Sequence, residues 1–159
     1  MNQGGIAAFL LSGWQLNGIL RLVSGTPFTI TSDATSCDCP GNSQFGQQVG
    51  PVHYPHGIGT SPWFSTSSFA PPPPGQFGNV GFNSVRGPTL KQYDFSLFRG
   101  FHIWENVELQ GRGEFYNLTN TPNFSNPDAA VTDSSFGLIT STANGGNQRA
   151  TQIAIKLLF

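Results

Sequence analysis

The stretch that decides the fold is the last eleven residues, Arg149-Ala-Thr-Gln-Ile-Ala-Ile-Lys-Leu-Leu-Phe159. Its odd positions from Ile153 onward are all apolar, whereas its even positions mix Gln152 and Lys156 with small or apolar residues. A period of two residues is typical of a β-strand, because successive side chains point to opposite faces. The sequence therefore predicts a terminal strand with one apolar face.

The same alternation recurs in three earlier segments, residues 14–22, 92–101 and 107–116. In the last of these, the odd positions carry no charge, whereas the even positions carry three charged residues. The clearest segments have about ten residues, the length that a tilted strand needs to cross the hydrocarbon of a bilayer. The alternation therefore predicts an all-β protein whose strands have two unlike faces.

The composition excludes several classes of protein. Only 9% of the 159 residues are charged, against about 25% in an ordinary soluble domain. No run approaches the roughly 20 apolar residues of a membrane helix. The formal net charge is -1, and no run of Lys and Arg is present, so nothing favours binding to nucleic acid.

The connections between the predicted strands alternate in length. Taken with a strand before the turn at Ser12-Gly13, they are short (11–13), long (26–91), short (102–106) and long (117–148). Bacterial outer-membrane barrels show this pattern, with short periplasmic turns and long extracellular loops. We therefore predict an antiparallel up-and-down meander of about five strands, a fragment of a large transmembrane β-barrel with two long extracellular loops.

This arrangement places particular residues at each end of the sheet. Trp14, Trp104 and Phe159 are expected at the periplasmic end, where an aromatic girdle belongs. The two long loops are expected to be poorly packed, with residues 136–140 adding at most a short strand, and His102 is expected in a solvated turn. In this arrangement the apolar faces of the strands meet outer-membrane lipid.

A series of motifs in a fixed order resembles a known family. The motifs are Gly13-Trp-Gln-Leu-Asn-Gly-Ile19, Ser24-Gly-Thr-Pro-Phe28, Trp63-Phe64 with Phe69-Ala-Pro71, Gly81-Phe-Asn-Ser-Val-Arg-Gly-Pro88, Asp94-Phe-Ser-Leu-Phe98, Arg112-Gly-Glu-Phe-Tyr-Asn-Leu-Thr-Asn-Thr-Pro-Asn-Phe124 and Leu157-Leu-Phe159. Together they resemble the C-terminal end of TonB-dependent outer-membrane receptors, in particular the subgroup with an N-terminal carboxypeptidase-regulatory-like domain.

The resemblance implies a barrel of about 22 strands around an N-terminal plug. Such a receptor imports a ligand with energy relayed by the TonB system. Residues 1–159 are then expected to be a partial C-terminal segment of one barrel domain, without the plug and the N-terminal strands, and inactive alone. The resemblance also implies that Phe159 acts as an assembly signal for the barrel assembly machinery in the bacterial outer membrane.

The charged residues of the strands allow two interpretations. Asp94, Glu108, Arg112 and Glu114 could serve as paired carboxylates with an arginine for acid/base chemistry. In a barrel, the same residues form a polar ladder that faces the lumen. The sequence also lacks the common nucleophile, zinc-protease and phosphate-binding motifs. We therefore expect no enzymatic activity and no cofactor.

A weaker pattern combines two cysteines with two histidines. Cys37, Cys39, His53 and His56 are of the residue types that bind zinc. The single residue between the cysteines is shorter than the usual spacing of two to four. A local disulfide, or none, is the alternative in an oxidising compartment.

A second class of protein also fits the alternating strands. A secreted or cell-surface β-sandwich, with an adhesive or carbohydrate-binding function, would bury the apolar face against a second sheet instead of lipid. The aromatic residues of the long loops either contact a ligand or glycan or pack the loops against the barrel rim; they are Trp63, Phe64, Phe69, Phe77 and Phe82. The sequence identifies no particular ligand.

Overall fold

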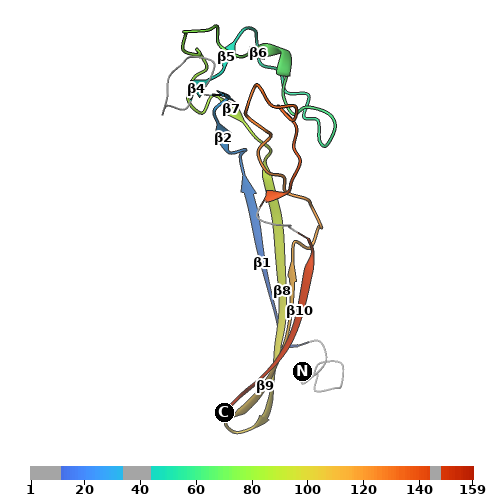
Figure 1. Cartoon of the computed structure of the whole chain (residues 1–159). Coiled ribbons are helices and arrows are strands. Elements are labelled where there is room, and N and C mark those ends of the chain that lie inside the picture. The colour runs from blue at the N-terminus through green and yellow to red at the C-terminus, as the bar shows by residue number, and fades with distance from the viewer. Residues whose placement is uncertain (1–11, 34–43, 144–147) are drawn as a thin grey trace. The chain divides into compact units, whose positions relative to one another are not determined.

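The computed structural model describes residues 12–33, 44–143 and 148–159 (Figure 1). The chain divides into two compact units. The sheet unit comprises residues 1–22, 91–121 and 147–159, and the loop unit comprises residues 23–90 and 122–146. No helix in the part of the chain that the structure describes has the length and apolar character of a membrane-crossing segment.

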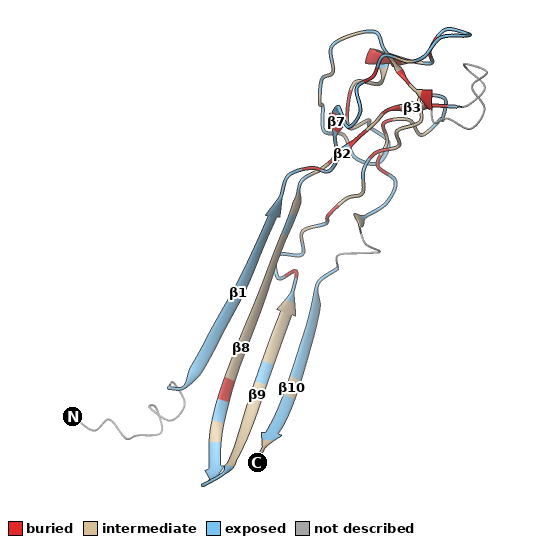
Figure 2. Cartoon of the chain, turned by 90° about the vertical axis from the view of Figure 1, so that its left-hand side faces the viewer, coloured by how far each residue is buried: buried red, intermediate tan, exposed pale blue. Residues whose placement is uncertain are grey.

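The sheet unit is built on four strands in the order β1-β8-β9-β10. Their bounds are β1 (Trp14–Val23), β8 (Leu90–Trp104), β9 (Val107–Tyr116) and β10 (Ala150–Leu158). Neighbouring strands run in opposite directions (Figure 2), which confirms the predicted antiparallel meander. The additional strand predicted before Ser12 lies outside the described residues.

The hairpin between β8 and β9 is tighter than predicted. A turn over residues 102–106 was expected, but β8 continues to Trp104 and only Glu105 and Asn106 form the turn. The register shifts between His102 and Trp104, because a β-bulge takes up one extra residue and lets pairing continue. His102 therefore lies in a strand opposite Glu108 and not in a turn, although it is exposed as expected.

The register of the sheet separates an apolar face from a polar face. Leu97 lies beside Gly113, which in turn lies beside Ile153. One residue along, Ser96, Glu114 and Gln152 form the neighbouring row and project to the opposite side. The predicted odd and even faces of these three strands are therefore confirmed.

The apolar face has no protein core beneath it. Ile153 is 80% exposed and Ile155 is 75% exposed. Among the described residues, every buried hydrophobic side chain belongs to the loop unit and none to the sheet unit. Figure 2 shows the same contrast, with the four long strands coloured exposed or intermediate almost throughout. Because so many aliphatic side chains are uncovered on one face, that face requires an apolar environment.

In the portion that the structure describes, the loop unit contains three small two-stranded sheets and a turn of 3-10 helix. The pairs are β2 (Pro27–Phe28) with β7 (Val85–Arg86), β3 (Thr31–Ser32) with β4 (Gln44–Phe45), and β5 (Gln47–Gln48) with β6 (Phe69–Ala70). The 3-10 helix η1 (Thr66–Ser68) leads directly into β6.

A hydrophobic core holds the loop unit together, so the prediction of poorly packed loops was wrong. Phe64 is fully buried at the centre. Its ring lies 6.1 Å from that of Phe28, 5.6 Å from that of Phe69 and 5.3 Å from that of Phe136. Phe136 belongs to the expected strand over residues 136–140, but it makes only an isolated bridge with Asp128 and packs on this core instead.

Two glycines fix a close approach inside the loop unit. The Gly87 backbone N–H donates a hydrogen bond of 3.1 Å to the Thr26 carbonyl oxygen. A Cβ atom on Gly25 would collide with the carbonyl of Gly87, and one on Gly87 would collide with the side-chain oxygen of Asn126. At Gly25 the obstacle is backbone, so only glycine fits there, which explains the glycine of the Ser-Gly-Thr-Pro motif in physical terms; at Gly87 the obstacle is a side chain that would have to move.

Candidate functional site

The polar face of the sheet unit carries the first group of candidate residues. Arg112 Nη2 lies 2.6 Å from Glu114 Oε1 on the same strand. The Tyr116 hydroxyl donates a hydrogen bond of 3.1 Å to Glu114 Oε2, and the Arg112 guanidinium lies 5.4 Å from the centre of the Phe98 ring. Arg112, Glu114 and Tyr116 border a hollow of about 300 Å³ that Asn17 also lines. The result is a polar surface in which the closest charge pair lies along one strand.

Asp94 has a structural role at the end of the same face. One of its carboxylate oxygens accepts a hydrogen bond of 2.8 Å from the backbone N–H of Asn117, and both accept from Gln92 Nε2 at 3.0 and 3.1 Å. Glu108, the remaining candidate, lies opposite His102. The four predicted residues therefore share one face, as expected of a lumen-facing polar surface, but only Arg112 and Glu114 form an ion pair.

Asn117 is a structural residue that the sequence reasoning did not single out. It is 2% exposed and has a positive φ of 49°. Its side-chain oxygen accepts from the Thr121 N–H at 3.1 Å, and its side-chain nitrogen donates to the Thr121 carbonyl at 3.0 Å. Asparagine tolerates this left-handed conformation and bonds to nearby backbone. The signal was present in the Tyr-Asn-Leu-Thr-Asn-Thr-Pro run, which ends β9 and begins the connection to β10.

A cavity of about 540 Å³ lies within the loop unit, and three rings line it. The His56 ring is stacked 6.0 Å from that of Tyr54 and lies edge-on 4.5 Å from that of Trp63. The Trp63 indole N–H donates to the Arg86 carbonyl at 2.9 Å, and the Arg86 backbone N–H donates to the Tyr54 hydroxyl at 3.3 Å. The backbone of Arg86, in β7, therefore fixes the rings of Tyr54 and Trp63.

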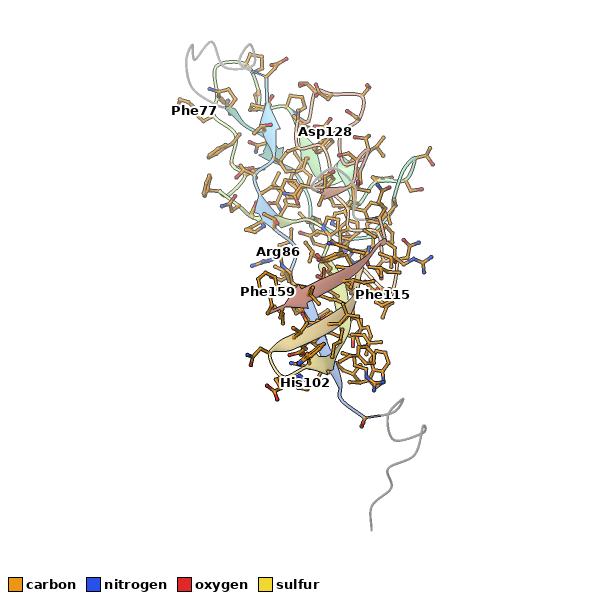
Figure 3. All side chains as sticks on the ribbon, turned by 90° about the horizontal axis from the view of Figure 1, so that it is seen from below. Phe77, Arg86, His102, Phe115, Asp128 and Phe159 are labelled. Carbon is orange, nitrogen blue, oxygen red and sulfur yellow. The ribbon has the colours of Figure 1, made fainter. Side chains whose placement is uncertain are left out.

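The other loop aromatics divide between the core and the surface. Phe64 and Phe69 are buried in the core of the loop unit. Phe77 is 74% exposed and Phe82 is 76% exposed, and Figure 3 labels Phe77 among the side chains. Phe64 and Phe69 therefore pack within the loop unit itself, which is neither the ligand contact nor the packing against the barrel rim that was expected, and Phe77 and Phe82 lie on its surface.

Two of the four zinc-ligand candidates lie within the described residues. Cys37 and Cys39 fall in residues 34–43, outside the part that the structure describes. His53 and His56 are both exposed, and His56 packs between rings. No group of three or more His, Cys, Asp or Glu side chains comes together among the described residues.

The aromatic residues predicted at one end of the sheet do lie at a common end. Trp14 begins β1, Trp104 ends β8, and Phe159 follows β10, which places them together in an antiparallel sheet. Phe159 is 98% exposed. On the apolar face near this end, the Arg99 guanidinium lies 5.4 Å from the Trp14 ring and 4.5 Å from the Phe101 ring.

These features define a class of protein. Antiparallel strands of nine to fifteen residues, an uncovered apolar face and a polar opposite face are the properties of a transmembrane β-barrel wall. The family model described as outer membrane beta barrel domain matches residues 1–152. The chain belongs to this family, and it is a protein of the bacterial outer membrane. Neither the curated proteins nor the solved structures contain a match to it.

Proposed function

We propose that this chain forms part of the barrel of a TonB-dependent receptor that takes up an as yet unidentified ligand and has no enzymatic activity. The observation that carries this proposal is the folded loop unit. Both long connections enter it, and its core orders side chains around a cavity. Binding sites are often placed on loops that a rigid scaffold positions. A second support is the order of the sequence motifs, which resembles that of TonB-dependent receptors.

The proposed receptor includes further strands and a plug. Among the described strands, β1 and β10 are the two edges of the sheet. Small barrels need about eight strands to close, and an open edge in hydrocarbon leaves backbone groups unsatisfied at several kcal/mol each. Additional strands would join β1 to β10, and a plug would face the polar side of the sheet.

The proposal can be tested with the native full-length protein extracted from outer membranes in mild detergent. We expect it to migrate differently on gels before and after heating, and to bind the purified periplasmic domain of TonB in a calorimetric titration. A heat-modifiable protein that does not bind this domain would refute the receptor proposal and leave a passive barrel. The expected role of the barrel assembly machinery is tested separately below, through Phe159.

A further inference from the structure

The cavity of the loop unit has the properties of a ligand site. We propose that it binds a carboxylic acid carried on a six-membered ring, such as a uronate residue of a glycan. Its volume of about 540 Å³ falls within the roughly 300–1,000 Å³ of small-molecule sites. This inference names a ligand class for the receptor and, for uptake, rests on the proposed function; binding itself requires neither TonB nor energy.

The rings of the cavity are held in position before any ligand arrives. The Tyr54 hydroxyl and the Trp63 indole N–H are each hydrogen-bonded to the backbone of Arg86. The two rings therefore offer mainly apolar contact area to a ligand. His56 lies between them and has a positive φ of 57°. A backbone outlier held by its surroundings is common at binding sites. Fixed aromatic side chains lose little conformational entropy on binding, and they suit a flat or ring-shaped body.

Arg86 determines the charge that the cavity selects. Among the described residues that line the cavity, it is the only Arg, Lys, Asp or Glu, so an anionic group is favoured there. Its Nη1 makes a single long hydrogen bond of 3.4 Å to the Gly25 carbonyl. Because a guanidinium has five N–H donors in a planar fork, enough remain within the described contacts for a bidentate bond to a carboxylate.

The remaining polar groups suit a ligand with hydroxyls. Ser24 and Thr89 also line the cavity, and each hydroxyl can both donate and accept a hydrogen bond. An acidic sugar presents all three features at once, namely a ring, a carboxylate and hydroxyl groups. An aromatic carboxylic acid presents the first two. The two sources share the chemistry that Arg86 and the rings recognise, and the experiment distinguishes them.

The test is a calorimetric titration of the full-length protein in detergent with trigalacturonate and, separately, with 4-hydroxybenzoate. The neutral counterparts are galactotriose and 4-hydroxybenzyl alcohol. We expect trigalacturonate to bind, its neutral counterpart to bind at least about tenfold more weakly, and Arg86→Gln to lower the affinity about 10- to 100-fold, as loss of a charged hydrogen bond implies. Arg86→Lys should retain part of the affinity, and Arg149→Gln, at an exposed position immediately before β10, should change nothing.

Each outcome decides the proposal. Binding of 4-hydroxybenzoate alone would retain the site and assign it to aromatic acids. Failure of both acids to bind, or equal binding of acids and neutral counterparts, would overturn it. Limited proteolysis shows whether Arg86→Gln leaves the loop unit folded; if it does not, the comparison of acid with neutral counterpart decides. If the protein binds the acid but does not bind the periplasmic domain of TonB, the receptor proposal is refuted and the proposed ligand site stands.

Discussion

Replacement of Ile153 by arginine tests which face of the sheet meets lipid. Ile153 lies near the middle of β10 (Ala150–Leu158) and is 80% exposed in the sheet unit. Its neighbour across the strand pair is Gly113, which offers no side chain to cover an introduced charge. An arginine there would project into the hydrocarbon of the membrane.

The expected cost follows from the depth of this position. Arginine on the lipid face near the midplane of a barrel destabilises it by about 2–4 kcal/mol, which is a roughly 30- to 700-fold change in the folding equilibrium. Gln152→Arg is the matched control, because Gln152 is adjacent in sequence, projects to the polar face and lies opposite Glu114. An arginine beside that carboxylate is expected to cost far less.

The assay is reversible denaturant unfolding of the full-length protein reconstituted in lipid bilayers, with the two variants measured side by side. A difference of about 2 kcal/mol or more, with Ile153→Arg the less stable, would confirm the facing of β10. Equal costs would refute it, and a larger cost at Gln152 would reverse the assignment of the two faces.

Three further changes test other parts of the structure. Asn117→Ala should lower the free energy of unfolding by about 2–4 kcal/mol, because two side-chain hydrogen bonds are lost and alanine disfavours a positive φ. Asn117→Gly should recover about 1 kcal/mol of this loss in the same denaturant assay, because glycine tolerates a positive φ. Equal losses in the two variants would contradict the backbone part of the argument. Gly25→Ala should make the loop unit sensitive to limited proteolysis, because the added Cβ atom would collide with the Gly87 carbonyl. Gly50→Ala in the same unit should not, because a Cβ atom there makes only ordinary van der Waals contact with Ser68, and equal sensitivity of the two variants would contradict the collision argument. Deletion of Phe159 should reduce the amount of full-length protein in outer-membrane fractions, measured by immunoblot, and an unchanged amount would count against its role as an assembly signal.

The strands were predictable because each one repeats the same physical signal. In β9, the two-residue alternation defines both the strand and its faces, and the predicted bounds of residues 107–116 are the observed ones. The end of β8 was not predictable in the same way. The bulge beyond His102 interrupts the alternation, so the pattern stops before the hydrogen-bonded pairing does.

The loop unit could not be predicted by periodicity. Its core draws single residues from distant points of the chain, such as Phe28, Phe64 and Phe136, and no local window contains a repeat that reveals their contacts. The ring-lined cavity was missed for the same reason, although Trp63 was recognised as a possible ligand contact. A useful signal was the pair of glycine motifs, since a Cβ atom at Gly25 would collide with the backbone of Gly87.

That close approach between Gly25 and Gly87 also bears on how the chain folds. β8 and β9 are joined by a two-residue turn, so this hairpin can form within microseconds. Pairing β1 with β8 instead closes a long stretch of chain, at an entropic cost that delays such non-local contacts. Once the loop unit has formed, Gly25 and Gly87 are already in contact, two residues after β1 ends and three before β8 begins. Formation of the loop unit would then bring the end of β1 close to the start of β8, so that pairing of these two strands no longer requires closure of a long loop.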